Sequence, residues 1–271
     1  TYKFKDFSSQ DRSGDGVSLV QMMFSLTTRG EAAHKIIEDY NQFTLNNKEN
    51  YGLREFKIRA KYRVTGFTKR GWNTLDKNYW TSFHIGSRIL EFYNVVPLES
   101  YVMSKEEDGE VKELKITGHY IYGYFRNDGT LYKIYQPKVT DSKFIKVKEY
   151  IQGTDQLTFK VPYLVICSSL KDMGAFKRLG FSNCECVAPD SENTLIGDAV
   201  ITSYKHKYKA VITLFDNDSA GINAMEKYAE NYKLPKVHLN LSKDLSDSMR
   251  DFGVENVRDT ITPLLKEAIN G

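Results

Sequence analysis

A short apolar run that ends in acidic residues constrains this chain more than any other feature. Residues 210–215 are Ala-Val-Ile-Thr-Leu-Phe, and Asp216, Asn217 and Asp218 follow at once. Val, Ile and Phe in such a run are typical of a buried parallel strand, and the Ser-Ala-Gly after Asp218 indicates that a helix begins there. Asp216 and Asp218 are therefore predicted at the carboxyl end of a strand, where α/β sheets bind ligands.

Two carboxylates at such an edge have two interpretations. They suit a hard divalent cation such as Mg²⁺, which takes oxygen ligands. Alternatively, both acids only cap the helix that follows. Asp-x-Asp after a strand is a common arrangement, so the motif alone leaves both interpretations open.

Neighbouring segments repeat the pattern of strand and helix. Residues 163–167 (Tyr-Leu-Val-Ile-Cys) form a second buried run, followed by a helical pattern up to Gly180, and residues 184–187 and 236–239 are two more short apolar segments. This alternation predicts an α/β domain with a parallel sheet and crossover helices. Acidic residues follow these strands and should converge on one edge: Asp172, Asp216, Asp218, Asp244 and Asp247.

This order of acids resembles the Toprim domain of primases and topoisomerases. The match is close at residues 215–221 and at residues 243–247, Lys-Asp-Leu-Ser-Asp. The family carries a catalytic Glu after its first strand, and that Glu aligns with Ser168 here. Phage replication primases often have the Ser-Leu-Lys-Asp that this chain has at residues 169–172.

The resemblance implies roles for individual residues. It implies that Mg²⁺ or Mn²⁺ is bound first by Asp216 and Asp218 and second by Asp244 and Asp247. Asp172 and Asp216 are expected to be catalytic. Lys171 and Lys243 lie beside these acids in the sequence, where they either contact a triphosphate or only balance charge.

Glu192 is a candidate for the carboxylate that Ser168 lacks. It follows the strand predicted at residues 184–187, and the loop after that strand should emerge at the same edge of a parallel sheet. Glu192 would then act as a metal ligand or as the base that takes a proton from the attacking hydroxyl. The alternative is an acid in a solvated loop.

The rest of the chain resembles other parts of a primase. Residues 1–50 resemble the end of the zinc-binding module that precedes many primase cores, plus a helix, but no Cys or His occurs before His34. A helix is predicted over residues 31–42 and a linker over residues 45–50. We expect a basic subdomain of mixed α+β structure at 51–158, the Toprim domain at 159–255 and a C-terminal helix at 256–271. Because the chain begins with Thr1, we expect it to be part of a longer protein.

A basic stretch precedes the predicted Toprim domain. Residues 54–88 include nine Lys and Arg but only two acids, Glu55 and Asp76, although the net charge of the whole chain is only +3. Aromatic residues lie among them, and such a surface suits phosphates and stacked bases. The alternative is a solvated basic helix face with the aromatics in the core. Nucleic-acid contacts are predicted for five residues: Arg59, Lys61, Arg63, Arg126 and Lys133.

The resemblance implies a primase of phage type, a DNA-directed RNA polymerase that makes short RNA primers on single-stranded DNA. Ribonucleoside triphosphates and a replicative helicase are the implied partners. Two alternatives remain: a catalytically silent module that binds single-stranded DNA, which the loss of the Glu at Ser168 would permit, and a Toprim nuclease. No run is long and apolar enough for a membrane helix and no signal peptide is evident, so a cytoplasmic protein is expected.

Overall fold

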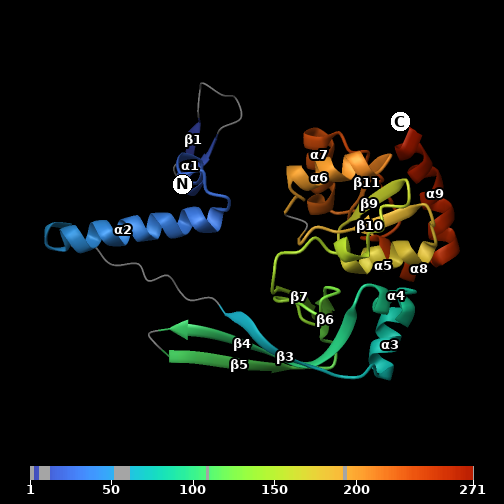
Figure 1. Ribbon diagram of the computed structural model, residues 1–271, viewed down its shortest axis with the longest axis horizontal. Helices are drawn as coiled ribbons and strands as arrows, with labels where there is room; N and C mark the ends of the chain where they lie inside the picture. Colours follow the sequence, from blue (N-terminus) through green and yellow to red (C-terminus); the bar gives the residue numbers. More distant parts are fainter. Residues whose placement is uncertain (1–2, 6–12, 52–61, 108–109, 192–193, 271) are drawn as a thin grey trace. The chain divides into compact units, whose positions relative to one another are not determined.

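The computed structural model describes residues 3–5, 13–51, 62–107, 110–191 and 194–270. These residues fall into two compact units, 1–62 with 105–112 and 63–104 with 113–271. Figure 1 labels the elements of each unit along the chain.

The first unit contains a hairpin and two helices. β1 (Lys3–Lys5) and β2 (Ser13–Asp15) are antiparallel, and α1 (Gly16–Met23) follows directly. α2 (Arg29–Tyr51) includes the helix predicted over residues 31–42. The linker predicted at 45–50 is wrong, because this polar segment holds no Gly or Pro to stop the helix before Gly52.

The second unit begins with a sheet of six antiparallel strands. Their order is β3-β4-β6-β7-β8, and β5 pairs with β4. The strands have these bounds: β3 (Arg63–Lys69), β4 (Val95–Glu107), β5 (Glu110–Thr117), β6 (Tyr122–Phe125), β7 (Leu131–Tyr135) and β8 (Phe144–Lys146). β6 and β7 form a hairpin whose turn contains Asp128 and Gly129, and Gly129 has a φ of +81°, a conformation that favours glycine.

Two short helices connect β3 to β4. α3 (Thr74–Thr81) begins with a reciprocal cap, in which Asn73 Oδ1 accepts from the Asp76 backbone and Asp76 Oδ2 accepts from the Asn73 backbone. α4 (Ser87–Phe92) follows. Trp80 of α3 is 1% exposed, so this aromatic of the basic stretch belongs to the core rather than to a binding surface.

A parallel sheet of three strands forms the rest of the second unit. β9 (Tyr163–Cys167) lies between β10 (Cys184–Val187) and β11 (Ala210–Leu214), as the strand pattern predicted. In the register, Val165 lies between Cys186 and Ile212. The side chains of β9 alternate between two buried clusters, because successive residues of a strand point to opposite faces.

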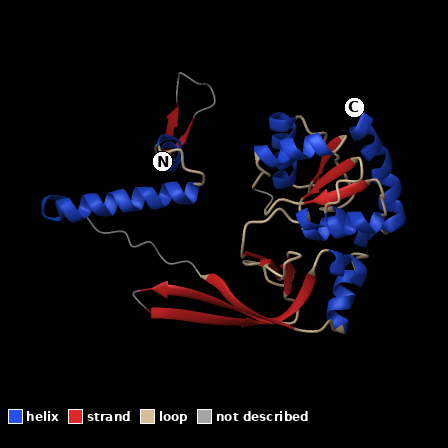
Figure 2. Cartoon of the chain, viewed as in Figure 1, coloured by secondary structure: helices blue, strands red, loops and turns tan. Residues whose placement is uncertain are grey.

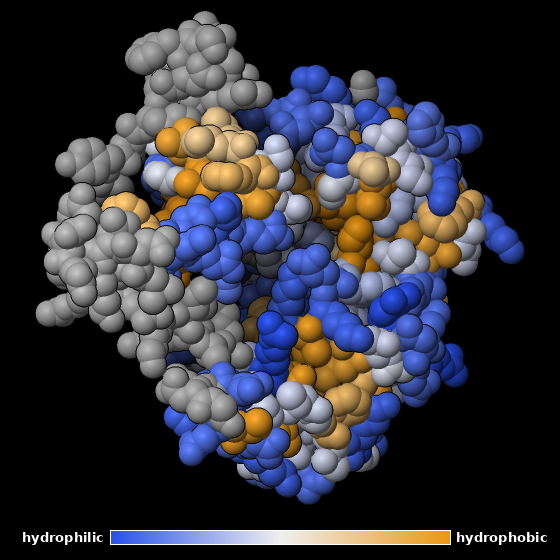
Figure 3. Space-filling model, turned by 60° about the vertical axis from the view of Figure 1, so that its left-hand side comes forward, coloured by the Kyte–Doolittle hydropathy of each residue, from blue (hydrophilic) through white to orange (hydrophobic). Residues whose placement is uncertain are grey.

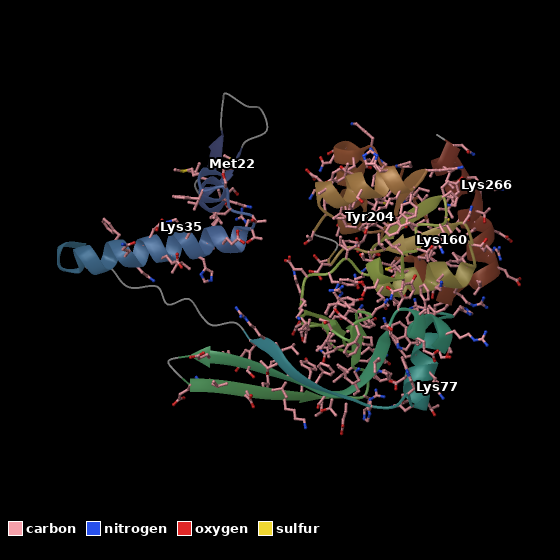
Figure 4. All side chains as sticks on the ribbon, in the orientation of Figure 1. Met22, Lys35, Lys77, Lys160, Tyr204 and Lys266 are labelled. Atoms are coloured by element: carbon pink, nitrogen blue, oxygen red, sulfur yellow. The ribbon has the colours of Figure 1, made fainter. Side chains whose placement is uncertain are left out.

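Five helices cover the two faces of this sheet, as Figure 2 shows in blue around the red strands. Their bounds are α5 (Leu170–Leu179), α6 (Asp198–Lys207), α7 (Ser219–Tyr232), α8 (Leu245–Phe252) and α9 (Val254–Asn270), and a 3₁₀ turn, η1 (Thr154–Gln156), precedes β9. Residues of α5, α8 and α9 pack in one cluster with Val165, and residues of α6 and α7 pack in the other with Leu164. Tyr204, labelled in Figure 4, belongs to the second cluster.

The strand predicted at residues 236–239 is wrong. Lys236 makes only an isolated parallel bridge to Thr213 of β11. β11 ends at Leu214, one residue beyond Thr213, so residues 238–239 have no strand to pair with. The segment nevertheless lies alongside β11 and leads the chain to the same edge of the sheet.

The surface gives no sign of a membrane span. Hydrophilic residues cover much of the face that Figure 3 shows, with smaller apolar areas between them. Among the residues that the structure describes, no helix combines the length and the apolar composition needed to cross a bilayer.

Candidate functional site

Three aspartates meet at the carboxyl edge of the parallel sheet. Asp172 lies in the first turn of α5, Asp216 lies two residues beyond β11, and Asp244 is the N-cap of α8. One carboxylate oxygen of each lies within 4.8 Å of the others. Asp172 and Asp216 are buried, and we call the three residues the acidic triad.

The backbone around Asp216 is tightly packed against α7. A Cβ atom on Gly221 would lie 2.2 Å from the carbonyl oxygen of Asp216 and 2.8 Å from its nitrogen, so only glycine allows this approach. The next residue, Asn217, donates its N–H to the carbonyl oxygen of Lys243 at 2.6 Å. These contacts hold the loop after β11 against the loop before α8, and thereby bring Asp216 near Asp244.

Ser168 lies between two members of the triad. Its Oγ is 2.9 Å from Asp172 Oδ2 and 2.5 Å from Asp216 Oδ1. A hydroxyl has one proton and can donate to only one of these carboxylates at a time. The side chain that replaces the family's Glu therefore supports the triad without adding a negative charge.

The environment of Asp172 disfavours its charge. Burial raises the pKa of Asp172 to about 7, and the negative charge of Asp244 adds to this effect. Hydrogen bonds from Ser169 Oγ and from the backbone N–H of Ser246 orient the carboxylate. A cation bound at the triad would offset the repulsion.

Asp218 lies beside the triad, and one of its oxygens contacts the backbone of α7. Its Oδ1 accepts hydrogen bonds from the backbone N–H groups of Ala220 and Gly221, so it caps α7, as the second interpretation of the motif predicted. The bond from Gly221 is the main reason that the pKa of Asp218 is lowered. Its other oxygen lies 3.4 Å from Lys243 Nζ and stays near the site.

Lys171 and Asp247 form a second charged group at this edge. Lys171 Nζ lies 3.4 Å from Asp244 Oδ2 and 3.5 Å from Asp247 Oδ1. Burial opposes the charge of Lys171, but Asp244 and the other nearby carboxylates more than offset it and raise the pKa of Lys171. Asp247 Oδ1 also pairs with Arg250 at 2.9 Å. Asp247 therefore forms ion pairs with two cations, Lys171 and Arg250, and is not a member of the triad.

A cavity of about 340 Å³ opens onto the triad. Four lysines from separate parts of the chain line it together with the three aspartates: Lys133, Lys143, Lys171 and Lys243. Sequence reasoning missed Lys143, which lies on the loop between β7 and β8. The only indication in the sequence was the positive charge of this residue, and a charge alone does not reveal which cavity a side chain faces.

Lys133 lies in this cavity and not on an outer surface. It is 6% exposed, its ammonium donates to the carbonyl oxygen of Asp190, and it lies 3.7 Å from Asp190 Oδ1. Lys146 Nζ pairs with the other oxygen of Asp190 at 2.7 Å. Burial lowers the pKa of Lys133 to about 8, although the charge of Asp190 partly offsets this.

The basic stretch is only partly described. Arg63, Lys69, Lys77 and Arg88 are exposed, and Lys77 is labelled on α3 in Figure 4. Arg70, in contrast, is bound by ion pairing to the buried Asp76.

Three of the predicted residues lie outside the described residues: Arg59, Lys61 and Glu192. Arg126 lies elsewhere, on the turn after β6, where it pairs with Asp155 and Asp128.

The triad fits a divalent cation. Carboxylate oxygens are the ligands that hard cations prefer, and three of them lie within 4.8 Å of one another among the residues described. Asp172, Asp216 and Asp244 would hold the ion, with Ser168 supporting two of them.

Comparison with known proteins gives a family match that covers this site. Residues 165–249 match the Toprim-like family, and this range contains all three aspartates of the triad. Comparison with curated proteins gave no match. The structure is similar to the zinc-binding and RNA polymerase domains of the Aquifex aeolicus primase, with 14% identity, a TM-score of 0.52, and 93% of this chain and 71% of that chain covered.

Two structures from bacteriophage T7 are also similar. The primase fragment of its primase-helicase protein has 15% identity and a TM-score of 0.45, with 76% of this chain and 83% of that chain covered. A complex of its lagging-strand DNA polymerase with primase domains bound to an RNA/DNA hybrid and dTTP has 16% identity and a TM-score of 0.44, with 72% and 97% covered. Residues 165–249 therefore form a Toprim-like domain within a chain that has the fold of a Toprim-containing primase core.

Proposed function

We propose that this chain is the catalytic core of a phage-type primase, which makes short RNA primers on single-stranded DNA by metal-dependent nucleotidyl transfer. One observation carries the proposal: a triad of aspartates in a Toprim-like domain shares one cavity with four lysines, two of which come from the neighbouring antiparallel sheet. Carboxylates can hold a divalent cation, and lysines can neutralise a triphosphate. Nucleotidyl transfer needs both in one place.

In this proposal Asp172, Asp216 and Asp244 hold Mg²⁺ or Mn²⁺. The ion, when bound, would stabilise negative charge on the phosphoryl oxygens and acidify the attacking hydroxyl. Lys133, Lys143 and Lys243 would draw the triphosphate into the cavity and orient it. Ser168 would support the carboxylates of Asp172 and Asp216 by donating its one proton to either of them.

Glu192 remains our candidate for the group that accepts the proton of the attacking hydroxyl. The residues before it in the chain, Asp190 and Ser191, line the same cavity, which supports this proposal. The single-stranded DNA template would bind to the basic stretch ahead of the Toprim-like domain, with Arg63 as one contact. Arg126 and the partner helicase stay predictions from the resemblance.

Ser168 favours one alternative. A site without the family's Glu could bind metal and DNA but lack catalysis, so the protein would be a silent module that binds single-stranded DNA. A nuclease would use the same cation to cut DNA instead of extending RNA.

One assay separates these functions. The protein is incubated with single-stranded template, labelled ribonucleotides and either Mg²⁺ or Mn²⁺, and the products are separated by length. We expect short RNA products, and Asp216→Asn should lower their rate by about 10²-fold or more. Asp259→Asn, an equal change on an exposed part of α9, is the control.

The outcomes are distinct. No RNA with either ion, together with intact DNA binding, would support the silent module, and cleaved template would support the nuclease. If Glu192→Gln makes primers at the wild-type rate, Glu192 is a bystander.

A further inference from the structure

Lys171 occupies an unusual place for a basic residue. It precedes Asp172 of the triad, and its side chain is only 12% exposed. Its ammonium lies between Asp244 and Asp247, at 3.4 and 3.5 Å from their oxygens. The ring of Phe83 closes a third side, with its centroid 4.4 Å from the ammonium. Lys171 is thus held as a counter-ion and is not free to reach a ligand.

The surroundings of Asp247 reinforce this arrangement. Its Oδ1 faces Lys171 and also Arg250, whose Nη1 is 2.9 Å away. The guanidinium of Arg250 lies over the same Phe83 ring, 5.5 Å from its centroid. A divalent cation placed on Asp247 would meet two fixed positive charges at short range, and like charges so close repel strongly in a partly buried site.

The acids at this edge therefore divide into two groups. Asp172 and Asp216 face Ser168, while the ion pairs of Lys171 within 4 Å go to Asp244 and Asp247, although the charge of Asp172 also raises the pKa of Lys171. Asp244 belongs to both groups, because one of its oxygens completes the triad while Oδ2 faces Lys171. Two-metal sites place their ions about 4 Å apart on shared carboxylates. Here the position next to the triad is filled by an ammonium.

We propose that Lys171 is a built-in cation that takes the place of a second metal ion, so that the protein binds one divalent ion at this edge instead of two. The inference rests on the proposed use of the triad as a metal site. It assigns Lys171 a positioning role, since it acts through Asp244 and Asp247 and not on the substrate. Removing its charge should open a second metal position between these two acids.

The test counts metal ions without nucleotide or DNA. Mn²⁺ is titrated into the full chain, and bound ions are counted by calorimetry and by electron paramagnetic resonance. The same titration on Asp244→Asn counts the ions that bind elsewhere in the protein. Subtracting that number from the total for the protein under test gives the number of ions at this edge of the sheet. We expect one ion for the wild type and two for Lys171→Met, with the spin coupling of paired Mn²⁺ ions appearing only in the variant.

Matched variants control for charge and fold. Lys143→Met removes the same charge from the same cavity, but Lys143 lies over the rings of Tyr135 and Phe144, so the count should stay at one. Lys171→Arg keeps the cation and should also bind one ion. Circular dichroism verifies that each variant is folded.

Two results overturn the proposal. Two Mn²⁺ ions bound at this edge in the wild type would reject it without any result from Lys171→Met. The proposal can therefore be tested even if that variant does not fold. A folded Lys171→Met that still binds one ion rejects it as well. Because the count needs no polymerisation, a protein that makes no primers can still bind one ion, and failure of the proposed function is seen separately.

Discussion

Gly221→Ala tests whether the close packing of α7 against Asp216 sets the geometry of the triad. A Cβ at this position would lie 2.2 Å from the carbonyl oxygen of Asp216 and 2.8 Å from its nitrogen. Non-bonded heavy atoms need roughly 3.5 Å, so the two backbones must separate by about 1 Å. Both clashing atoms belong to the backbone, and no side-chain rotation can relieve the strain.

The sign of the stability change follows from two opposing effects. Alanine in a helix is favoured over glycine by about 1 kcal/mol. Overpacking costs about 1–3 kcal/mol, and a clash with backbone lies at the upper end of that range. We therefore expect the free energy of unfolding of Gly221→Ala to be lower by about 2 kcal/mol than that of the wild type. For a domain of this size, the melting temperature should fall by about 4–8 °C.

The assay combines a thermal melt with Mn²⁺ titration. A shift of about 1 Å in Asp216 should weaken metal binding by about 10- to 100-fold, as expected when the support of a ligand is disturbed. Gly197→Ala is the control, because Gly197 precedes α6 with a φ of −64° and a Cβ there would meet open space. Unchanged metal affinity with an equal or higher melting temperature in Gly221→Ala would refute the reasoning.

Two further predictions concern charge. Because the pKa of Lys133 is lowered to about 8, its ammonium is present below that pH and lost above it, so ATP affinity measured without metal should fall between pH 7 and 9. Lys133→Met should remove this dependence, and a wild-type affinity that is flat across the range contradicts the prediction. Reversing Arg59, Lys61 and Arg63 to Glu should reduce the salt slope of single-stranded DNA binding by at least about 2, since each phosphate contact contributes about 0.7.

The sequence predicted the parallel sheet well, because its signal is local. Buried runs such as residues 163–167 and 210–214 end where the acids begin, and the structure confirms β9 and β11 at these places. The predicted strand at 236–239 is reduced to one bridge at Lys236, because its partner β11 ends at Leu214, one residue beyond Thr213. The linker predicted at 45–50 failed because polar residues were taken as the end of α2, although this segment holds no Gly or Pro that would stop a helix.

The candidate site was predicted in its residue types but not in its grouping. Asp216 and Asp218 are two residues apart, yet Asp216 turns into the triad while Asp218 caps α7. Asp172 lies in the first turn of α5, four residues after Ser168, and the hydroxyl of Ser168 contacts its carboxylate in the triad. The sequence placed Lys171 and Lys243 beside the acids, but it could not place Lys133 and Lys143 in the cavity, because they come from a different sheet. The position of these two lysines near the triad depends on tertiary packing, and no local sequence pattern predicts it.

Charge balance at the sheet edge gives an independent argument for a single divalent ion. Five aspartates gather there: Asp172, Asp216, Asp218, Asp244 and Asp247. Three cations pair with them, namely Lys171, Lys243 and Arg250. With all groups ionised, the difference is two negative charges, which one divalent ion neutralises. A second ion would leave an excess of two positive charges before any nucleotide arrives, in a site where fixed cations already surround Asp247. A Glu at position 168 and an uncharged residue at position 171 would add two negative charges, and a second ion would then balance. In the proposed one-ion site, Ser168 and Lys171 together would replace the charge that a second ion balances.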